Sequence, residues 1–275
     1  MRILLAGAGG QLGQDLEQVL AAEDLHAVRH QQLDIADRAA VSAIIHATRP
    51  DWVVNAAAFN DVDGAETARA QAFAVNADGP ATLAEAARAV GARLVHVSTD
   101  YVFDGAKGSA YTEDDPANPL SVYGESKRAG EVRVLESGVK AAVLRTAWLY
   151  GRHGKNFVKA ILTGAQSGKP LRVVADQVGS PTSTADLAIA IRDLIRTELQ
   201  GLFHVANAGA CSRFEFARTI VGGQVDVTPT SSTEAPRPAR RPANSSLTSV
   251  RWEEAGMSPM RSWQEALADY LQSGG

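Results

Sequence analysis

Cysteine is nearly absent from the chain, since Cys211 is the single cysteine among 275 residues. No disulfide can form within the chain, which suits a reducing compartment. Long hydrophobic runs are missing as well, because no stretch approaches the roughly 18 to 20 uninterrupted apolar residues that cross a membrane. The first apolar run ends in glycines at Gly7, too early for the core of a signal peptide. We therefore expect a cytoplasmic protein that does not enter a membrane.

A surplus of positive charge is also missing. The chain has 27 Lys and Arg against 31 Asp and Glu, which gives a formal net charge of −4. A general nucleic-acid-binding protein needs a basic face, so that class is disfavoured, although one local basic pocket for a phosphate stays compatible. The hydrophobic share of 45% is ordinary for a globular protein. The length allows one large α/β domain, or one domain with a smaller partner.

The first half of the chain alternates strand-like and helix-like segments. Short apolar runs predict parallel strands at Ile3–Ala6, His26–Arg29, Trp52–Ala58, Leu94–Ser98 and Ala141–Leu144. Helical patterns predict helices at Leu12–Ala22, Arg38–Ala47, Ala65–Ala74, Gly79–Val90 and Ser121–Glu136. Asp37 would be the N-cap of the helix at Arg38–Ala47. This βαβα rhythm predicts a doubly wound α/β fold, in which a parallel sheet has helices on both faces.

After Trp148 the rhythm changes. We expect helices at Asn156–Gln166, Thr184–Thr197 and Trp263–Leu271, and strands at Leu171–Val174 and Leu202–Val205, the latter returning to the main sheet. The stretch Val227–Ser249 is rich in Pro, Ser, Thr and Arg, which predicts an extended arm without regular structure. The expected units are residues 1–150 with about 183–207, and a smaller discontinuous unit of about 151–182 with 208–275 above the strand ends.

The first strand runs into a glycine-rich turn. Gly7, Gly10 and Gly13 form the pattern G-x-x-G-x-x-G, with Gly9, Gln11 and Leu12 inside it. The first glycine permits a tight turn, the second lets the backbone approach a pyrophosphate, and the third lets the helix pack closely on the strand. The helix N-terminus then faces the anion. A strand, this turn and a helix at the start of a βαβ chain predict a dinucleotide-binding domain, which would be the first of the two units.

The second strand indicates which nicotinamide dinucleotide would bind. NAD sites place an acid at the end of this strand for the ribose 2′-hydroxyl, whereas this chain has Arg29 there. An arginine can pair with the 2′-phosphate of NADPH, and Asp34 and Ile35 would pass the adenine. We therefore expect NADPH, with NADH still possible. In the alternative interpretation, Arg29 is an ordinary solvated side chain.

A tyrosine and a lysine are spaced for acid–base chemistry. Tyr123 and Lys127 lie four residues apart in a predicted helix, so both side chains share one face. A free phenol has a pKa of about 10. A cation about 4 Å away at an effective dielectric near 20 contributes about 4 kcal/mol, enough to lower that pKa by roughly 3 units. Lys127 could also bind the ribose hydroxyls. Because the pattern arises often by chance, an exposed pair without a function is the alternative.

A hydroxyl is expected beside this pair. Ser98 and Thr99 follow the fourth strand, and ligands of an open parallel sheet lie beyond the carboxyl ends of its strands. A hydroxyl there can donate a hydrogen bond to a substrate carbonyl. Thr99 is our candidate and Ser98 the alternative.

These segments resemble a known superfamily. The glycine turn and the segments Asn55–Ala58, Asn76, Ser98–Gly105 and Tyr123–Lys127 are similar to those of extended short-chain dehydrogenases/reductases. More specific likenesses are to the dTDP-4-dehydrorhamnose reductase family, and they cover nearly the whole chain through Ser98–Gly105, Arg145–Gly151, Asn156–Phe157, Asp176–Thr182 and Arg241–Leu247.

The resemblance implies an activity and a set of roles. NAD(P)H would reduce the 4-keto group of dTDP-4-dehydro-L-rhamnose, giving dTDP-L-rhamnose. Tyr123 would donate the proton, Lys127 would be its electrostatic partner, and Thr99 would bind the carbonyl. Further cofactor contacts would come from Ala56, Ala57, Ala58 and Asn76. Substrate contacts would come from Asp100, from Trp148 against the sugar, and from Asn156, Asp176 and Thr182.

Some features leave alternatives open. Arg241, in the basic arm, is a candidate phosphate contact or a solvated charge. Phe59 and Asn60 stand where the family often has His-Thr, and Arg29 stands where many members have an acid. Some relatives bind Mg²⁺ at a dimer contact, but we place no acidic cluster for a metal here. The chain would be a monomer or homodimer acting on a nucleotide sugar. Another NDP-4-ketosugar reductase, or a non-catalytic NADP-binding regulatory subunit, would be the competing interpretation.

Overall fold

The main sheet is parallel and doubly wound. The computed structural model describes residues 1–168 and 170–274. Six strands lie in the order β10-β5-β4-β3-β1-β2, and each neighbouring pair is parallel. They are β1 (Arg2–Ala6), β2 (Asp24–Val28), β3 (Trp52–Asn55), β4 (Arg93–Thr99), β5 (Ala141–Thr146) and β10 (Gly201–His204). The chain winds outward from β1 in both directions, so the predicted fold class and the return of the late strand to the sheet are confirmed.

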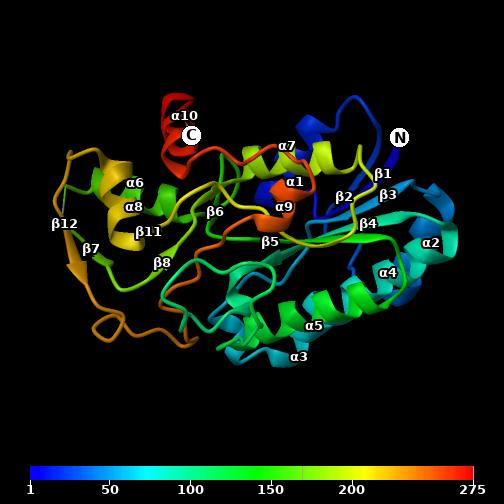
Figure 1. Ribbon diagram of the computed structural model, residues 1–275, viewed down its shortest axis with the longest axis horizontal. Coiled ribbons are helices and arrows are strands. Elements are labelled where there is room, and N and C mark those ends of the chain that lie inside the picture. The colour runs from blue at the N-terminus through cyan, green and yellow to red at the C-terminus, as the bar shows by residue number, and fades with distance from the viewer. Residues whose placement is uncertain (169, 275) are drawn as a thin grey trace.

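Helices cover both faces of this sheet (Figure 1). Alternating strand residues point to opposite faces, so Ile3 and Leu5 belong to one core cluster and Leu4 to the other. The first cluster packs beneath α1 (Gln11–Val19), α7 (Thr184–Leu194) and α9 (Val250–Glu254). The second packs against α2 (Arg38–Thr48), α4 (Gly79–Val90) and α5 (Val122–Glu136). Asp37 caps α2 by accepting from the backbone N–H groups of Ala39 and Ala40, as its position predicts.

A smaller group of elements lies at one end of the sheet, on the left of Figure 1. Its helices α6 (Phe157–Gln166), α8 (Arg213–Val221) and α10 (Trp263–Gln272) share an apolar cluster of their own. Two-stranded pairings join β12 (Val227–Thr230) to β7 (Leu171–Val174), β11 (Cys211–Ser212) to β8 (Val178–Gly179), and β6 (Leu149–Tyr150) to β9 (Thr182–Ser183).

Several local predictions were wrong. The expected arm at 227–249 begins with β12, which pairs in parallel with β7, because cross-strand bonding overrides its low strand propensity. Helices α8 and α9 were not predicted. The segment expected as one helix at 65–74 is the short 3₁₀ turn η1 (Gly64–Glu66) and then α3 (Arg69–Phe73), after which the π-helical turn η2 (Ala74–Asp78) leads directly into α4.

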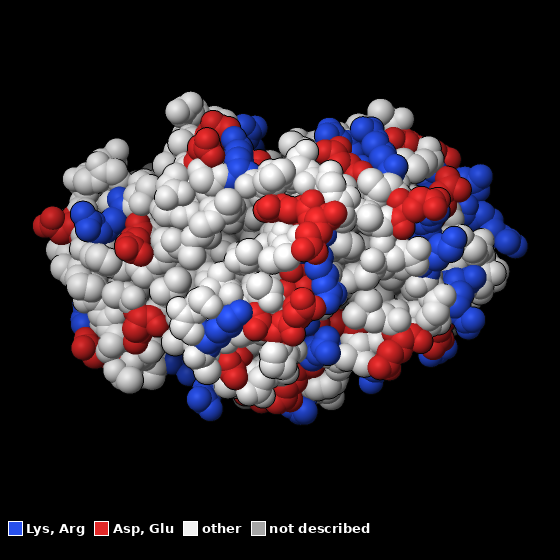
Figure 2. All heavy atoms as spheres, viewed as in Figure 1, with Lys and Arg blue, Asp and Glu red and all other residues white. Residues whose placement is uncertain are grey.

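Charged side chains of both signs lie on the surface. On the face drawn in Figure 2, basic and acidic side chains are interspersed rather than gathered into one broad field of positive charge. Among residues 1–168 and 170–274, no helix combines the length and the apolar character that a membrane crossing requires.

Candidate active site

The glycine turn between β1 and α1 leaves backbone N–H groups open. Gly7 has φ of +88°, and a side chain there would place its Cβ 2.5 Å from the backbone nitrogen of Ala57. A Cβ at Gly13 would lie 2.7 Å from the Cα of Ala8, so α1 packs on the turn through a bare backbone. Helix α1 begins after Gly10 with no side-chain cap. The N-terminus of α1 can therefore bind an anion.

A hollow of about 380 Å³ lies beyond the ends of β1 and β2. Its wall contains most of the predicted cofactor residues, namely Gly7, Gly9, Gly10, Arg29, Asp34, Ile35, Ala56, Ala57 and Ala58. The Arg29 side chain is half exposed and its guanidinium pairs with Glu17 at 3.2 Å. Exposed ion pairs contribute only about 0 to 1 kcal/mol, so this pairing can be exchanged for a stronger anion.

A second hollow, of about 390 Å³, adjoins the first and shares Gly10, Ala56 and Ala58 with it. We call the two hollows together the groove. The second hollow brings together the predicted residues Gln11, Leu12, Thr99, Asp100, Tyr123, Lys127 and Trp148. These residues come from α1, β4, α5 and the loop after β5. The groove therefore runs from the glycine turn to the predicted catalytic group, at the carboxyl ends of the strands.

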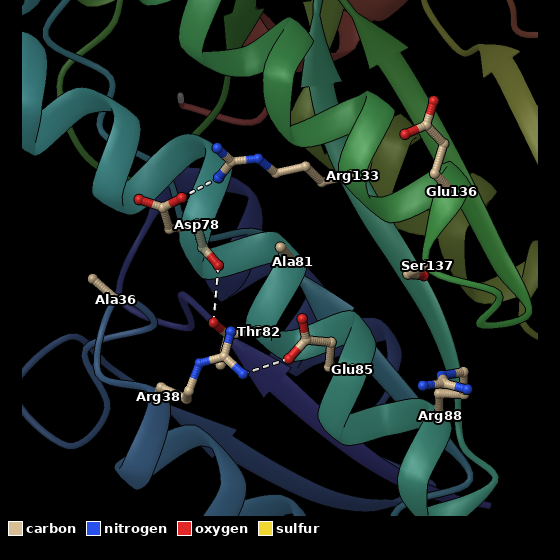
Figure 3. A pocket seen from close by; sticks show the side chains of 10 residues that line it. All are labelled: Ala36, Arg38, Asp78, Ala81, Thr82, Glu85, Arg88, Arg133, Glu136 and Ser137. Atoms are coloured by element: carbon tan, nitrogen blue, oxygen red, sulfur yellow. Dashed lines mark hydrogen bonds and ion pairs between the residues drawn. The ribbon is translucent and has the colours of Figure 1, made fainter.

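A larger hollow, of about 790 Å³, lies elsewhere, along α4 and α5 (Figure 3). Four of its six charged side chains bind one another. Arg38 pairs with Glu85, and Arg133 pairs with Asp78. Because these charges are already paired and the hollow lies on the outer helical layer, it is not our candidate site.

Lys127 and Tyr123 are both almost fully buried, at 2% and 8% exposure. The Lys127 ammonium donates to the carbonyl oxygen of Val97 at 2.7 Å. Burial lowers the pKa of Lys127 to about 8, against the opposing effect of Glu131. Burial likewise raises the pKa of Tyr123, although a hydrogen bond with Thr99 works in the other direction.

The expected lowering of the Tyr123 pKa by Lys127 is therefore wrong for this state of the protein. The reason is that the ammonium is directed to a strand carbonyl, while burial and the neighbouring Asp100 and Tyr101 favour the neutral phenol. A phenol that keeps its proton is nevertheless the form that can donate one.

Thr99, rather than Ser98, has the hydroxyl that lies beside Tyr123. The Ser98 hydroxyl donates to Glu131 Oε1 at 2.7 Å in the core. The Thr99 hydroxyl donates to Asp100 Oδ1 at 3.0 Å and lies beside Tyr123. Burial raises the pKa of Asp100 to about 6, although bonds from Ser245 and Thr99 favour its charged form.

Beneath these residues lies a buried ion pair that the sequence did not reveal. Glu131 on α5 and Arg145 on β5 are 0% and 1% exposed, and two hydrogen bonds of 2.8 Å join them. Burial raises the pKa of Glu131, but hydrogen bonds from Arg145 and Ser98 outweigh it and lower the pKa overall. The pair holds α5 against β4 and β5. No local pattern signals it, because it depends on two elements packing together.

Two predicted ligand contacts have side-chain amides that are hydrogen-bonded within the chain. Asn76, at 1% exposure, bonds both backbone groups of Phe59 and the hydroxyl of Ser126. Asn156 caps α6 and donates to Gln11 Oε1 at 3.0 Å and to the Gly151 carbonyl at 2.8 Å. Neither residue lines the groove, since each amide is committed within the chain.

Three further predicted substrate contacts are not among the residues that line the two hollows, although Arg241 reaches Tyr101 on the wall. The Asp176 carboxylate accepts from the backbone and hydroxyl of Ser232. Thr182, at 0% exposure, donates to the Ser180 carbonyl. Arg241 forms two hydrogen bonds, of 2.9 and 3.0 Å, with Asp63. The substrate contacts expected of these three residues, and of Asn156, stay predictions.

Arg213 is one of the groove residues that sequence reasoning missed. Its guanidinium lies 3.5 Å from the centroid of the Trp148 ring, and it lines the hollow that holds Thr99 and Tyr123. The capping box of Ser212 and Glu215 could have indicated the start of α8 at this residue.

The described residues contain no group of three or more His, Cys, Asp or Glu side chains arranged to hold a metal ion.

A doubly wound sheet, a glycine turn and a buried tyrosine–lysine pair at the strand ends define a dinucleotide-binding oxidoreductase of the extended short-chain dehydrogenase/reductase superfamily. A family model described as RmlD substrate binding domain matches residues 1–274. The chain belongs to the dTDP-4-dehydrorhamnose reductase family.

Individual relatives agree with this placement. The dTDP-4-dehydrorhamnose reductase of Mycobacterium tuberculosis H37Rv is 47% identical, over 98% of this chain and 92% of its own length. The crystal structure of the Bacillus anthracis dTDP-4-dehydrorhamnose reductase in complex with NADP superposes with a TM-score of 0.96, at 39% identity and 99% coverage of both chains. A probable dTDP-4,6-dihydroxy-2-methyloxan-3-one 4-ketoreductase of Streptomyces antibioticus is 43% identical, over 98% of this chain and 94% of its own length.

Proposed function

We propose that this protein reduces the 4-keto group of dTDP-4-dehydro-L-rhamnose with NADPH, giving dTDP-L-rhamnose. The observation that carries the proposal is the convergence of Thr99, Tyr123 and Lys127 in a groove that continues to the glycine turn. The names of the family's members supply the substrate. A non-catalytic NADP-binding subunit is disfavoured, because it has no need of a buried tyrosine–lysine pair.

The residues of the groove fit NADPH. The turn at Gly7–Gly13 and the N-terminus of α1 would hold the pyrophosphate. Arg29 would exchange Glu17 for the 2′-phosphate, and Asp34 and Ile35 would flank the adenosine. Ala56, Ala57 and Ala58 offer a smooth wall along the dinucleotide. When bound, the dihydronicotinamide supplies a hydride to the ketone carbon.

The side chains of the second hollow would handle the ketone oxygen. Thr99 would exchange its hydrogen bond to Asp100 for one to the ketone oxygen and so orient the carbonyl. Tyr123, whose pKa burial raises, holds the proton that the developing alkoxide needs. Lys127 provides a buried positive charge, which binds the ribose and favours the tyrosinate that remains after the transfer. Asp100 and the Trp148 ring would hold the sugar.

The proposed division of labour follows the chain. Residues 1–150 with about 183–207 would form the cofactor-binding unit, and about 151–182 with 208–275 the substrate unit. We propose the cytoplasm as its location, since nucleotide sugars and NADPH are available there, with the protein acting as a monomer or homodimer.

The direct test follows NADPH absorbance with purified protein and dTDP-4-dehydro-L-rhamnose. The expected outcome is oxidation of NADPH with dTDP-L-rhamnose as the product, identified by NMR. If the protein binds NADPH but leaves this ketosugar unreduced, the proposed substrate is wrong.

Cofactor preference is a separate test. Wild type should prefer NADPH over NADH in kcat/KM, and Arg29→Asp should reduce or reverse the preference. The Arg29 assignment fails if wild type shows no preference and the variant leaves the NADPH/NADH ratio unchanged.

A second candidate is reduction of another dTDP-4-ketosugar. It is favoured by the 43% identical Streptomyces antibioticus relative, whose name describes a probable ketoreductase acting on a different dTDP-sugar. Assaying dTDP-4-dehydro-L-rhamnose beside dTDP-4-keto-6-deoxy-D-glucose, and comparing kcat/KM, separates the two candidates.

A further inference from the structure

Arg213 is a half-buried cation without an anionic partner. Its guanidinium stacks 3.5 Å from the Trp148 ring centroid and 5.0 Å from that of Phe157. It forms no ion pair with any carboxylate in residues 1–168 and 170–274. Burial lowers the pKa of this guanidinium, and an unpaired charge removed from water is costly. Because the unpaired charge lies in the wall of a groove, we expect its anionic partner to be a ligand that binds in the groove.

The surroundings hold Arg213 in place in advance. Trp148, which supports it, has a φ of +45°, a conformation that non-glycine residues rarely adopt. The indole packs over Gly179, where a Cβ would lie 2.6 Å from the indole nitrogen. On α8 itself, Glu215 is turned away, because its carboxylate accepts from the backbone and hydroxyl of Ser212 at 2.8 and 3.0 Å.

The other cations around the groove are committed or lie elsewhere. Lys127 donates to a strand carbonyl, and Arg241 is held by Asp63. Lys155 is exposed beside Gln11, on the side of the glycine turn. The nearest acid to Arg213, Asp100, bonds with Thr99 and Ser245 instead of forming an ion pair. Arg213 is thus the half-buried cation of the substrate side.

We propose that Arg213 binds the diphosphate of the nucleotide-sugar substrate. This inference rests on the proposed function. A guanidinium presents a planar fork of donors that matches phosphate oxygens. Its position on the Trp148 ring places the guanidinium in the hollow that also holds Thr99 and Tyr123. The Tyr101 hydroxyl, which lies close to Arg213, would bound the same subsite.

The test compares dTDP with thymidine by calorimetry on the NADPH-loaded protein. Arg213→Met keeps the aliphatic stem between the rings and removes the charge. We expect its Kd for dTDP to rise roughly 10- to 100-fold, the loss of a hydrogen-bonded charge, while weak thymidine binding and NADPH binding stay unchanged. Arg213→Lys should recover part of the loss.

Arg218→Met is the matched control. Arg218 lies on the same helix and also faces an aromatic ring, that of Phe214, with 5.7 Å to its centroid, but it does not line the groove. Its affinity for dTDP should equal that of wild type. Retained NADPH binding in every variant shows that each has folded.

The outcomes distinguish this inference from the proposed function. If Arg213→Met binds dTDP as wild type does, or weakens dTDP and thymidine equally, the diphosphate assignment is overturned even when wild type reduces the ketosugar. In another outcome, wild type leaves that ketosugar unreduced, while Arg213→Met binds dTDP more weakly than wild type and Arg218→Met does not. The diphosphate assignment then stands and the proposed substrate is wrong.

Discussion

The buried ammonium of Lys127 should make the protein less stable at neutral pH while serving its activity. Its pKa falls from the ordinary 10.5 to about 8 in the folded chain, so the charged form is disfavoured by folding. At about 1.4 kcal/mol per pKa unit, the fold then costs about 3 kcal/mol at pH 7, where Lys127 is charged in both states. The cost starts to fade as the pH rises through 8, because the folded state loses its proton first, and it disappears above 10.5.

Lys127→Met removes this titration and keeps most of the side-chain volume. The variant's free energy of unfolding, relative to wild type, should be higher at pH 7 than at pH 10 by about 2 kcal/mol. Urea unfolding of both proteins without cofactor at the two pH values measures this difference. Lys140→Met, at an exposed lysine, is the control and should leave the difference near zero.

The same variant should lose NADPH affinity and turnover, so its stability and activity move in opposite directions at pH 7. The burial argument would be refuted if the free energies of unfolding of wild type and Lys127→Met differed by the same amount at both pH values, within about 0.5 kcal/mol. That result would mean that the ammonium is better solvated than its 2% exposure indicates.

Further predictions concern the proton donor, the turn and the buried ion pair. Tyr123→Phe should lower kcat by about 10²- to 10⁴-fold with the Kd for NADPH nearly unchanged, and near-normal turnover would remove Tyr123 from its role. Gly13→Ala places a Cβ against the backbone of the turn and should weaken NADPH binding at least tenfold, whereas Gly108→Ala, with open space around it, should not. Glu131→Gln leaves the Arg145 charge unpaired in the core and should cost about 3 to 5 kcal/mol in urea unfolding; a loss below about 1 kcal/mol would contradict the pairing.

The cofactor half of the groove could be predicted from the sequence because its signals are local. Gly7, Gly10 and Gly13 carry meaning through spacing within one turn, and the flanking apolar runs identify the strand and the helix. The i, i+4 spacing of Tyr123 and Lys127 likewise refers to one helix. In each case, the residues that determine the geometry are neighbours in the chain.

The substrate half could not be predicted in the same way. Whether a polar side chain there is hydrogen-bonded within the chain depends on residues far away in the sequence. Asn156 bonds Gln11 across 145 residues of sequence, and Arg241 bonds Asp63 across 178. A pattern within the arm cannot show that an aspartate after β3 satisfies its arginine. Arg213 illustrates the reverse case, because its lack of a partner emerges only once the chain is folded.

Three buried ionisable groups on the groove wall differ from the buried ion pair that lies behind it. Behind the wall, Glu131 and Arg145 offset each other's burial through two hydrogen bonds of 2.8 Å. On the wall, burial shifts the pKa values of Lys127, Asp100 and Arg213 against their charged forms, and none of the three forms an ion pair within residues 1–168 and 170–274. Selection for stability alone would replace such groups. The presence of these three groups is explained if their missing partners are the ribose, the sugar and the diphosphate of bound ligands. Saturating ligand should then stabilise the protein most strongly when cofactor and nucleotide are present together.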